Sequence, residues 1–367
     1  MYSTDNRIVI TLDAGGTNFV FGAIQANEFI IAPITLPSLA DNLETCLNNL
    51  EKGFHMVIER LPERPVAISF AFPGPADYPQ GIIGGELPNF PSFREGVALG
   101  AFLEEKFHLP VFINNDGDLY AYGEAIAGVL PEVNERLAKA GSSKRYKNLV
   151  GYTMGTGFGC GIALGGRLHL GDNSCGAETW CMRNYLMPEC IVEEGVSIRA
   201  VKRIYGELTS NPDHGLEPKD ICAIAAGETP GDQHAAIRTF EMLGQVAGDA
   251  MANAVTLVDG LIAIGGGLTG AAQYFLPALL RQMNGTIKGT NGQVFNRTPL
   301  KVYNLDDEVQ FAEFARGKAK EIVVPGTLRT VTFDPERRIG IAISKLGASR
   351  AISLGAYAFA LSKIDAQ

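Results

Sequence analysis

Hydrophobic positions along the chain form short runs typical of strands and longer stretches with helical spacing. Strands are predicted at residues 7–12, 19–24, 28–32, 66–72, 111–113, 149–170 and 261–264. Helices are predicted near 41–60, at 97–107, 119–129 and 235–258, around 271–283 and at 349–361. Because strands and helices alternate along the chain, we expect an α/β fold.

Two segments depart from this pattern. Residues 131–148 are polar and basic, which predicts an exposed excursion, and residues 285–335 lack a clear period, which predicts an inserted loop or hairpin. Glycine-rich hairpins at 13–22 and 153–161 hint at a duplicated architecture. A length of 367 residues favours two domains.

Glycine is unusually frequent. The chain holds 43 glycines, whereas average usage of about 7% would give about 26. Fifteen of them lie within 13–17, 151–176 and 265–270, so the surplus marks particular loops. The 46% hydrophobic content excludes a disordered chain, and the net charge of −9 argues against a nucleic-acid-binding surface.

The sequence also bears on compartment. The polar residues Met1–Arg7 lead into an apolar run, Ile8–Leu12, that is too short for a signal peptide core or a membrane span. The six cysteines show no disulfide-scaffold pattern. We therefore expect a reduced, cytoplasmic protein with no membrane partner.

Three glycine turns are candidates for phosphate binding, because residues without a Cβ let backbone N–H groups approach an anion. Asp13–Thr17 also offers a carboxylate that can hold Mg²⁺ through water. Gly155–Gly161 adds the Thr156 hydroxyl, although it fits neither a Walker loop nor a Rossmann fingerprint. Gly265–Gly267 precedes a helix, whose N-terminal dipole favours anions. The plain alternatives are a hairpin turn, closely packed strands and a strand-to-helix turn.

Asn115 and Asp116 follow a short predicted strand. A carboxylate at a strand end can project into a cleft and accept a hydroxyl proton. The alternative is a turn that caps the next helix. Because Asp118 suits the cap better, Asp116 is left for chemistry.

In their order along the chain, these motifs resemble the sugar kinases of the actin-like ATPase superfamily, specifically the ROK family of repressors, uncharacterised frames and kinases. Asp13–Thr17 is similar to the first phosphate motif, Gly155–Ile162 to the second and Ile264–Gly267 to the adenosine motif. The other matching segments are the turn Phe72–Asp77, the sugar-side region Leu87–Phe90, the pair Asn115-Asp116 with Tyr122–Glu124, and the closing helix around Ser353–Tyr357.

The resemblance implies two actin-like ATPase (ribonuclease H-like) α/β domains with a cleft between them. The smaller domain would span 1–116 and be joined by a C-terminal helix at about 347–367. The larger domain would span 117–346 and carry the insertion expected within 285–335. A homo-oligomer is implied as well, with a dimer favoured.

The implied function is an ATP-dependent hexose kinase that phosphorylates the primary hydroxyl of a hexose, with glucose the leading candidate. Asp116 would accept the hydroxyl proton and Asp13 would hold Mg²⁺ through water. The residues implied to bind ATP are Asp13, Gly15, Gly16, Thr17, Gly155, Thr156, Gly157, Gly265, Gly266 and Gly267. Those implied to bind the sugar are Gly74, Asn89, Asn115, Asp116, Glu178 and Glu193.

The sequence departs from the family in one region. Many members carry a histidine and a cysteine-rich zinc loop after the glutamate that corresponds to Glu178. Here the histidine position falls on Cys181, and Cys181 and Cys190 lack the close pairing that zinc ligation favours. We therefore expect no structural zinc.

Two other functions stay open. A sugar-sensing transcriptional regulator would carry an additional N-terminal winged helix, for which the strand beginning within about ten residues of Met1 leaves no room. A non-catalytic sugar-binding protein is the third candidate, although retention of Asp13 and Asp116 speaks against it. The identity of the hexose, and ATP against polyphosphate as donor, are left undecided.

Overall fold

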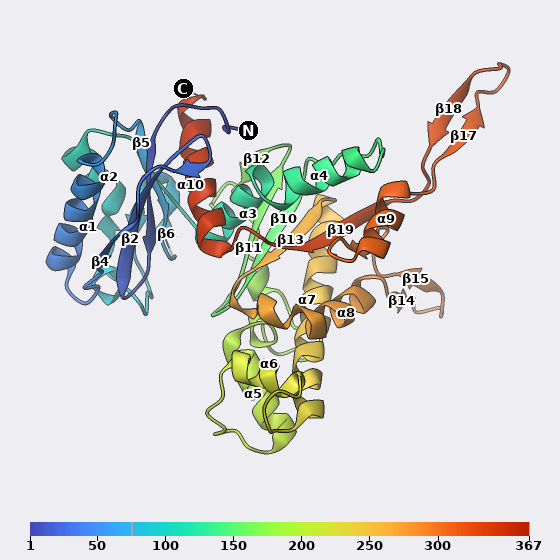
Figure 1. Ribbon diagram of the computed structural model, residues 1–367. Coiled ribbons are helices and arrows are strands. Elements are labelled where there is room, and N and C mark those ends of the chain that lie inside the picture. The colour runs from blue at the N-terminus through green and yellow to red at the C-terminus, as the bar shows by residue number, and fades with distance from the viewer. Residues whose placement is uncertain (75, 367) are drawn as a thin grey trace. The chain divides into compact units, whose positions relative to one another are not determined.

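The computed structural model describes residues 1–74 and 76–366, and the chain divides into two compact units (Figure 1). Unit 1 comprises Met1–Gly128, Gly161–Ala177 and Leu346–Gln367, and unit 2 comprises Val129–Cys160 and Glu178–Lys345. The domain boundary expected after Asp116 stays a prediction. Pro75, in the middle of the predicted turn Phe72–Asp77, lies outside the described residues.

Unit 1 is built on a sheet in which parallel and antiparallel strands meet at β1. Strand β2 pairs antiparallel with β1, β3 and β4, whereas β1, β5 and β9 run parallel. The strands of this sheet are β1 (Val9–Ala14), β2 (Asn18–Gln25), β3 (Glu28–Phe29), β4 (Ile34–Pro37), β5 (Ala67–Ala71) and β9 (Val111–Asn114). A small separate sheet contains β6 (Ala76–Asp77), β7 (Ile82–Ile83) and β8 (Val97–Ala98). Strand β12 (Arg167–His169) pairs with β11 (Phe158–Leu164). The helices are α1 (Leu43–Ile58), α2 (Leu99–Phe107), α3 (Asp116–Ile126) and α10 (Ala348–Ile364), with short 3-10 turns at Tyr78–Gln80 and Pro91–Phe93.

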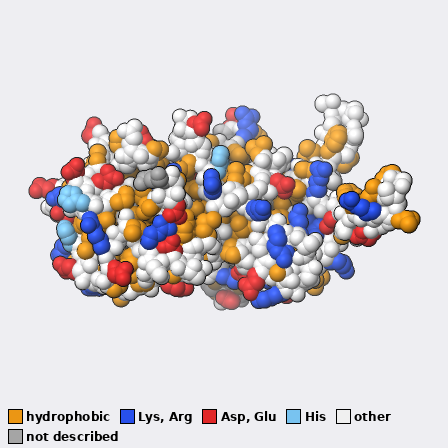
Figure 2. Space-filling view, turned by 90° about the horizontal axis from the view of Figure 1, so that it is seen from above, with side chains coloured by type: hydrophobic (Ala, Val, Ile, Leu, Met, Phe, Trp, Pro, Cys, Tyr) orange, Lys and Arg blue, Asp and Glu red, His pale blue; other side chains and the backbone are white. Residues whose placement is uncertain are grey.

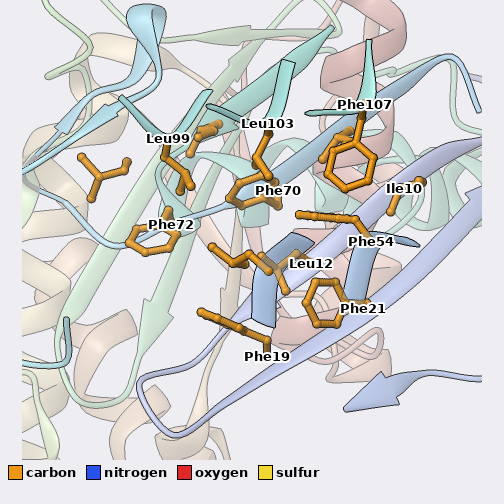
Figure 3. Packing of buried hydrophobic residues seen from close by; sticks show 14 of the residues in the cluster. Ile10, Leu12, Phe19, Phe21, Phe54, Phe70, Phe72, Leu99, Leu103 and Phe107 are labelled. Atoms are coloured by element: carbon orange, nitrogen blue, oxygen red, sulfur yellow. The ribbon is translucent and has the colours of Figure 1, made fainter. Parts of the chain in front are cut away.

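Helices cover both faces of this sheet, which explains why the run Ile8–Leu12 is apolar at nearly every position. Side chains alternate between the faces of a strand, so Ile10 packs with the aromatic cluster beneath α1 and α2 (Figure 3), while Val9 packs with α10. In the aromatic cluster, the rings of Phe21 and Phe54 meet edge to face with their centroids 5.1 Å apart.

Helices α3 and α10 approach each other closely through two glycines. A Cβ added at Gly123 would lie 1.9 Å from the carbonyl oxygen of Ala351, and one added at Gly355 would lie 1.9 Å from the carbonyl oxygen of Leu119. Only glycine permits this backbone contact. The contact fixes α3, which begins at Asp116, against the end of the chain.

Unit 2 holds the four parallel strands of a second, mixed sheet, in which β13 lies between β10 and β19, and β19 pairs with β16. Its strands are β10 (Leu149–Met154), β13 (Leu261–Gly265), β16 (Lys301–Asn304) and β19 (Arg338–Ile343), with the hairpins β14 (Thr286–Lys288) to β15 (Val294–Asn296) and β17 (Lys320–Val323) to β18 (Thr330–Phe333). Strand β11 (Phe158–Leu164) pairs with β10 and carries the chain from unit 2 into unit 1. The helices are α4 (Val129–Lys139), α5 (Ile198–Thr209), α6 (Pro218–Ala225), α7 (Gln233–Val258), α8 (Ala272–Met283) and α9 (Glu308–Arg316), with 3-10 turns at Thr179–Cys181, Val192–Glu194 and Gly267–Ala271.

The two sheets share one strand order, as the paired glycine hairpins suggest. The order β2-β1-β5-β9 corresponds to β11-β10-β13-β19, each with a hairpin at one side and parallel strands after it. The predicted α/β class is confirmed. None of the helices in residues 1–74 and 76–366 combines the length and apolar character of a membrane-spanning segment.

Two predicted segments differ from the structure. The first half of 131–148 is helix α4 rather than an exposed excursion, because Val129, Val133 and Leu137 form a buried stripe at four-residue spacing within a polar sequence. The 285–335 segment contains two hairpins but also β16 and α9, whose Phe311 and Phe314 are buried.

Candidate active site

In unit 1, the predicted catalytic and metal-binding residues lie at one edge of the sheet. The parallel pairing sets Asp13 beside Ala71, and Ala71 beside Asn114. The chain continues from these strand ends into the predicted Asp13–Thr17, Gly74 and Asn115-Asp116 segments. Carboxyl ends of parallel strands are the usual position for ligand sites in such sheets.

Hydrogen bonds with Asn18 and Ser38 fix the backbone of the first glycine turn. The backbone N–H of Gly15 donates to the carbonyl of Asn18 at 3.0 Å, and Ser38 donates to the carbonyl of Thr17 at 2.9 Å and, through its hydroxyl, to that of Gly16. The Asp13 and Thr17 side chains remain exposed. The turn therefore offers a carboxylate and a hydroxyl on a fixed backbone.

Asn89, a predicted sugar ligand, lies against this turn. A Cβ added at Gly16 would lie 2.8 Å from the Cβ of Asn89, so the two residues touch. Gly74 is similarly confined, since its added Cβ would lie 2.9 Å from the hydroxyl of Tyr78, which donates to the carbonyl of Phe72 at 3.0 Å. The structure thus brings one predicted sugar ligand next to the predicted phosphate turn.

Asp116 begins α3, and its neighbour Asn115 is the cap. The Asn115 side chain accepts from the N–H of Gly117 at 2.7 Å, and Asp116 Oδ1 accepts from the same N–H at 2.8 Å. The expectation that Asp118 caps this helix is wrong, because α3 begins two residues earlier and Asp118 is buried inside it. Asp116 nonetheless stays available at the surface of the sheet edge.

The surroundings change the acidity of Asp116. Surrounding protein atoms remove water from around its carboxyl and raise the pKa, hydrogen bonds from the Gly117 and Asp116 backbone lower it, and the negative charge of Asp13 raises it further. The net pKa lies above the ordinary value. A carboxylate with a raised pKa is a stronger proton acceptor.

In unit 2, the second and third glycine turns lie side by side. Their strands pair in parallel, with Thr153 beside Gly265. Gly266 has a positive φ of 95°, and a Cβ there would lie 2.4 Å from the carbonyl oxygen of Met154. A Cβ added at Gly155 would lie 3.9 Å from the backbone nitrogen of Gly267. Two loops about 110 residues apart in sequence therefore form one backbone surface.

A cavity of about 340 Å³ opens beside this surface, lined by Thr156, Ile198, Arg199 and Lys202. The last three residues belong to the first turns of α5, where Ser197 is the N-cap and Ile198 donates its N–H to the carbonyl of Gly155 at 2.8 Å. Two cations and a helix N-terminus suit an anion. Arg199 and Lys202 are not predicted from the sequence, in which only Ser197 before an amphipathic stretch signals the start of this helix.

Glu193 lies beneath the second turn. Its Oε2 accepts from the N–H of Phe158 at 3.0 Å, and its Oε1 accepts from Arg199 at 2.7 Å. A Cβ at Gly157 would lie 2.7 Å from Oε2, so a larger residue there would displace the Glu193 carboxylate. The other predicted sugar glutamate, Glu178, is exposed and accepts from the indole N–H of Trp180. The sugar-binding roles of both glutamates stay predictions.

The loop after Glu178 is organised around Asn184. This side chain is fully buried, and its Oδ1 accepts from the backbone N–H groups of Leu186 at 3.0 Å and Met187 at 3.2 Å. The backbone N–H of Asn184 donates to the carbonyl of Cys190 at 2.9 Å. The Sγ of Cys181 lies 3.0 Å from the carbonyl of Glu178. Within residues 1–74 and 76–366, no three His, Cys, Asp or Glu side chains are grouped so as to hold a metal ion.

Comparison with solved structures places this geometry among known proteins. A crystal structure of glucokinase from Parabacteroides distasonis is 60% identical to the chain, with 99% of each chain covered and a TM-score of 0.89. A ROK family glucokinase from Streptomyces griseus, solved with glucose and AMPPNP, shares 19% identity over 96% of this chain and 98% of its own, with a TM-score of 0.61, and supports the fold alone. The predicted fold class of two actin-like ATPase domains is confirmed.

Sequence relatives are more distant. A xylose repressor from Bacillus spizizenii is 28% identical over 140 residues, covering 37% of this chain and 32% of the repressor, so the chain spans about a third of that relative. A glucokinase from Streptomyces coelicolor is 23% identical over 316 residues, covering 77% of this chain and 89% of the glucokinase. The model of the ROK family matches residues 9–298. With well over half of its length matched, the chain belongs to the ROK family.

Proposed function

We propose that this protein is an ATP-dependent hexose kinase that transfers the γ-phosphoryl group to the primary hydroxyl of a hexose, with glucose as the first candidate. The observation that carries the proposal is the pair Asp13 and Asp116 at the carboxyl ends of β1 and β9, the two strands that flank β5, close enough for the charge of Asp13 to raise the pKa of Asp116. The glucokinases among the matching proteins, one of them solved with AMPPNP, support the enzyme class and the donor.

Asp116 is the proposed catalytic base. Its carboxylate accepts the proton of the primary hydroxyl as the hydroxyl oxygen attacks the γ-phosphorus, and ADP leaves with the electrons of the broken P–O bond. Asn89, Asn115 and Gly74 are the proposed sugar contacts in unit 1. The contact between Asn89 and Gly16 places a proposed sugar ligand directly beside the proposed phosphate turn.

Asp13 fits Mg²⁺ through water, because that ion keeps most of its hydration shell and needs few protein ligands. The exposed carboxylate of Asp13, on a turn fixed by Ser38, suits this outer-sphere role. When bound with ATP, Mg²⁺ would offset the charge of the β- and γ-phosphates. Gly15, Gly16 and Thr17 would contact the phosphates from unit 1.

The unit 2 loops would hold the rest of the nucleotide. Gly155, Thr156 and Gly157 are the proposed phosphate contacts, and the cavity with Arg199 and Lys202 supports this placement. The required glycine at 266 and the open space at Gly267 support a flat ligand on the third turn, where we place the adenosine. Cytoplasmic location and a homo-oligomer belong to the same proposal.

The test is an assay of ADP release across a panel of hexoses and N-acetylhexosamines with Mg²⁺ and ATP, repeated with polyphosphate as donor. We expect turnover with ATP and glucose. No sugar-dependent ADP release with any member of the panel would overturn the proposal.

A sugar-sensing transcriptional regulator is the second candidate, because a xylose repressor is among the relatives. Specific binding of operator DNA that is released by sugar, without phosphorylation of that sugar, would favour this candidate over the kinase.

A further inference from the structure

The segment 178–195 of unit 2 closes on itself through a short antiparallel pairing. A β-bridge joins Arg183 to Ile191. This pairing leads directly into the 3-10 turn Val192–Glu194, whose middle residue is Glu193. The position of the Glu193 backbone therefore depends on how the segment is closed.

Asn184 follows the bridge and lies at the centre of the closed segment, where its side chain is fully buried. Its Oδ1 accepts from the N–H groups of Leu186 and Met187, which shape the tip of the loop. Its Nδ2 packs against Gly195, since a Cβ added at Gly195 would lie 2.8 Å from that nitrogen. One side chain thus contacts both the tip of the segment and its end, two residues after Glu193.

Helix α5 fixes Glu193 from the other side. The hydroxyl of Ser197, the N-cap of α5, donates to the carbonyl of Glu193 at 2.8 Å. With its backbone held at both ends, Glu193 presents its carboxylate to the N–H of Phe158 and to Arg199. The contacts of Asn184 therefore reach the second glycine turn through Glu193.

Zinc, which the family resemblance places in this segment of many members, does not fit the donor set here. Structural zinc sites are closed by four Cys, His or carboxylate ligands. The segment has no histidine and two cysteines, Cys181 and Cys190, both exposed. Of its glutamates, Glu193 and Glu194 pair with Arg199. Hydrogen bonds close this segment instead.

Charged contacts around the segment are weaker determinants of its position. Acidic and basic side chains lie intermixed on the face of the protein shown in Figure 2, and ion pairs between exposed groups contribute little because water screens them. Arg203 donates to the carbonyl of Glu194 at 2.8 Å, but its partly exposed side chain also pairs with Glu207. Bulk water competes for such contacts, whereas it does not reach the fully buried amide of Asn184.

We propose that Asn184 is a positioning residue of the proposed kinase. Its buried side chain, without a metal ion, holds the segment that places Glu193 beneath the second glycine turn. Asn184 touches no substrate and acts on the proposed phosphate site through Glu193. This inference rests on the proposed function.

The experiment is a double-variant cycle on the full chain, measured by steady-state kinetics with ATP varied at saturating hexose. Asn184→Ala removes the Oδ1 acceptor, Glu193→Ala removes the carboxylate, and the double variant removes both. Asn184→Asp keeps an oxygen acceptor and changes only Nδ2, which has no hydrogen-bond partner among residues 1–74 and 76–366. Asn211→Ala, at an exposed position of the same unit, is the control.

We expect Asn184→Ala to raise the KM for ATP about fivefold and the double variant to match Glu193→Ala, because both changes act through one carboxylate. Asn184→Asp and Asn211→Ala should stay within about twofold of wild type. A loss of folded protein lowers the apparent kcat but not this KM, so a purely structural role gives a different result. An unchanged KM in Asn184→Ala would overturn the proposal, as would effects of the two variants that multiply.

Two further measurements complete the test. If circular dichroism shows that Asn184→Ala does not fold, Gly195→Ala replaces it in the cycle, because the added Cβ would displace the Asn184 amide. Elemental analysis of the purified chain should find no stoichiometric zinc, and one zinc per chain would contradict closure by hydrogen bonds. A wild-type chain without sugar-dependent ADP release refutes the proposed function, whereas an active wild type with independent variants refutes this inference alone.

Discussion

The carboxylate of Glu193 accepts a hydrogen bond from the backbone N–H of Phe158, 3.0 Å away, and so supports the second glycine turn from below. The other oxygen of Glu193 holds Arg199, which lines the cavity beside Thr156. One side chain therefore sets both the turn and a cation next to it. This arrangement makes Glu193 a positioning residue for the proposed phosphate site.

Replacement of Glu193 by alanine is expected to raise the KM for ATP about tenfold, since a hydrogen bond to a charged group contributes about 1.5–3 kcal/mol. Glu194→Ala is the matched control, because Glu194 also pairs with Arg199 at 2.8 Å, whereas the Phe158 N–H donates to Glu193. Steady-state kinetics with each substrate varied in turn distinguishes the roles. A change confined to the KM for hexose would instead favour the sugar contact implied by the family resemblance.

Asp116→Asn is expected to lower kcat by about 10²–10⁴-fold, the usual contribution of a general base. The KM values should change little, because asparagine keeps the oxygen that accepts from Gly117. Glu207→Gln, in an exposed ion pair with Arg203, is a control for charge removal that should leave activity unchanged. Near wild-type turnover by Asp116→Asn would show that another group accepts the proton.

Activity should also depend on pH through Asp116. Only the ionised carboxylate accepts a proton, and its pKa is raised, so kcat/KM should begin to fall on the acid side at a higher pH than an ordinary aspartate would give. Asp13→Asn removes a charge that raises this pKa, so any residual activity should show the acid limb moved to lower pH.

The raised pKa of Asp116 also predicts how the free energy of unfolding changes with pH. A raised folded-state pKa means that ionised Asp116 is less favourable in the folded chain, so stability is lost as the pH rises through this pKa. Asp116→Asn should therefore melt no lower than wild type at neutral pH. A clearly lower melting temperature would mean that the carboxylate stabilises the fold.

Gly266→Ala is expected to destabilise unit 2 by about 1–3 kcal/mol or more, because the added Cβ meets the Met154 backbone and φ is positive. Gly267→Ala adds its Cβ to open space, so its stability should stay within about 0.5 kcal/mol of wild type. Denaturant unfolding measures both. Calorimetric titration of Gly267→Ala with ATP then asks whether the nucleotide approaches this loop, and unchanged affinity would place it elsewhere.

Gly355→Ala should destabilise unit 1 by about 1–3 kcal/mol or more, although alanine is the better helix former. The reason is the carbonyl of Leu119, only 1.9 Å from the added Cβ. Ser349→Ala, at an exposed position of the same helix, is the control and should not destabilise. Equal melting temperatures of Gly355→Ala and Ser349→Ala would contradict the close contact of α3 and α10.

Sequence patterns predict the strands and helices that bury apolar side chains on one broad face or on both faces. The run Ile8–Leu12 predicts a strand because both of its faces are covered, and the periodicity of 235–258 predicts α7 within two residues of its observed start. Helix α4 was missed because its apolar stripe is narrow and its other positions are charged. Strand β16 was missed because it is short and its neighbour β19 is more than thirty residues away.

The candidate site also contains some residues that the sequence predicts and others that it does not. Glycines that backbone contact requires, such as Gly266, stand out in sequence, since no other residue fits. Arg199 and Lys202 do not, because only the tertiary position of α5 turns ordinary surface cations into the lining of a cavity. The cap of α3 was assigned to Asp118 rather than Asn115 because both residue types cap equally well.

Unit 1 is closed by a segment, Leu346–Gln367, that follows the whole of unit 2 along the chain. Helix α10 covers Val9, Ile24 and Ala67, which belong to strands near the beginning. On the ribosome, where the chain emerges from its N-terminus, these strands appear first yet keep an apolar face bare until α10 leaves the exit tunnel. All residues of unit 2 therefore leave the ribosome before unit 1 has its last helix, although unit 1 holds the first residues of the chain.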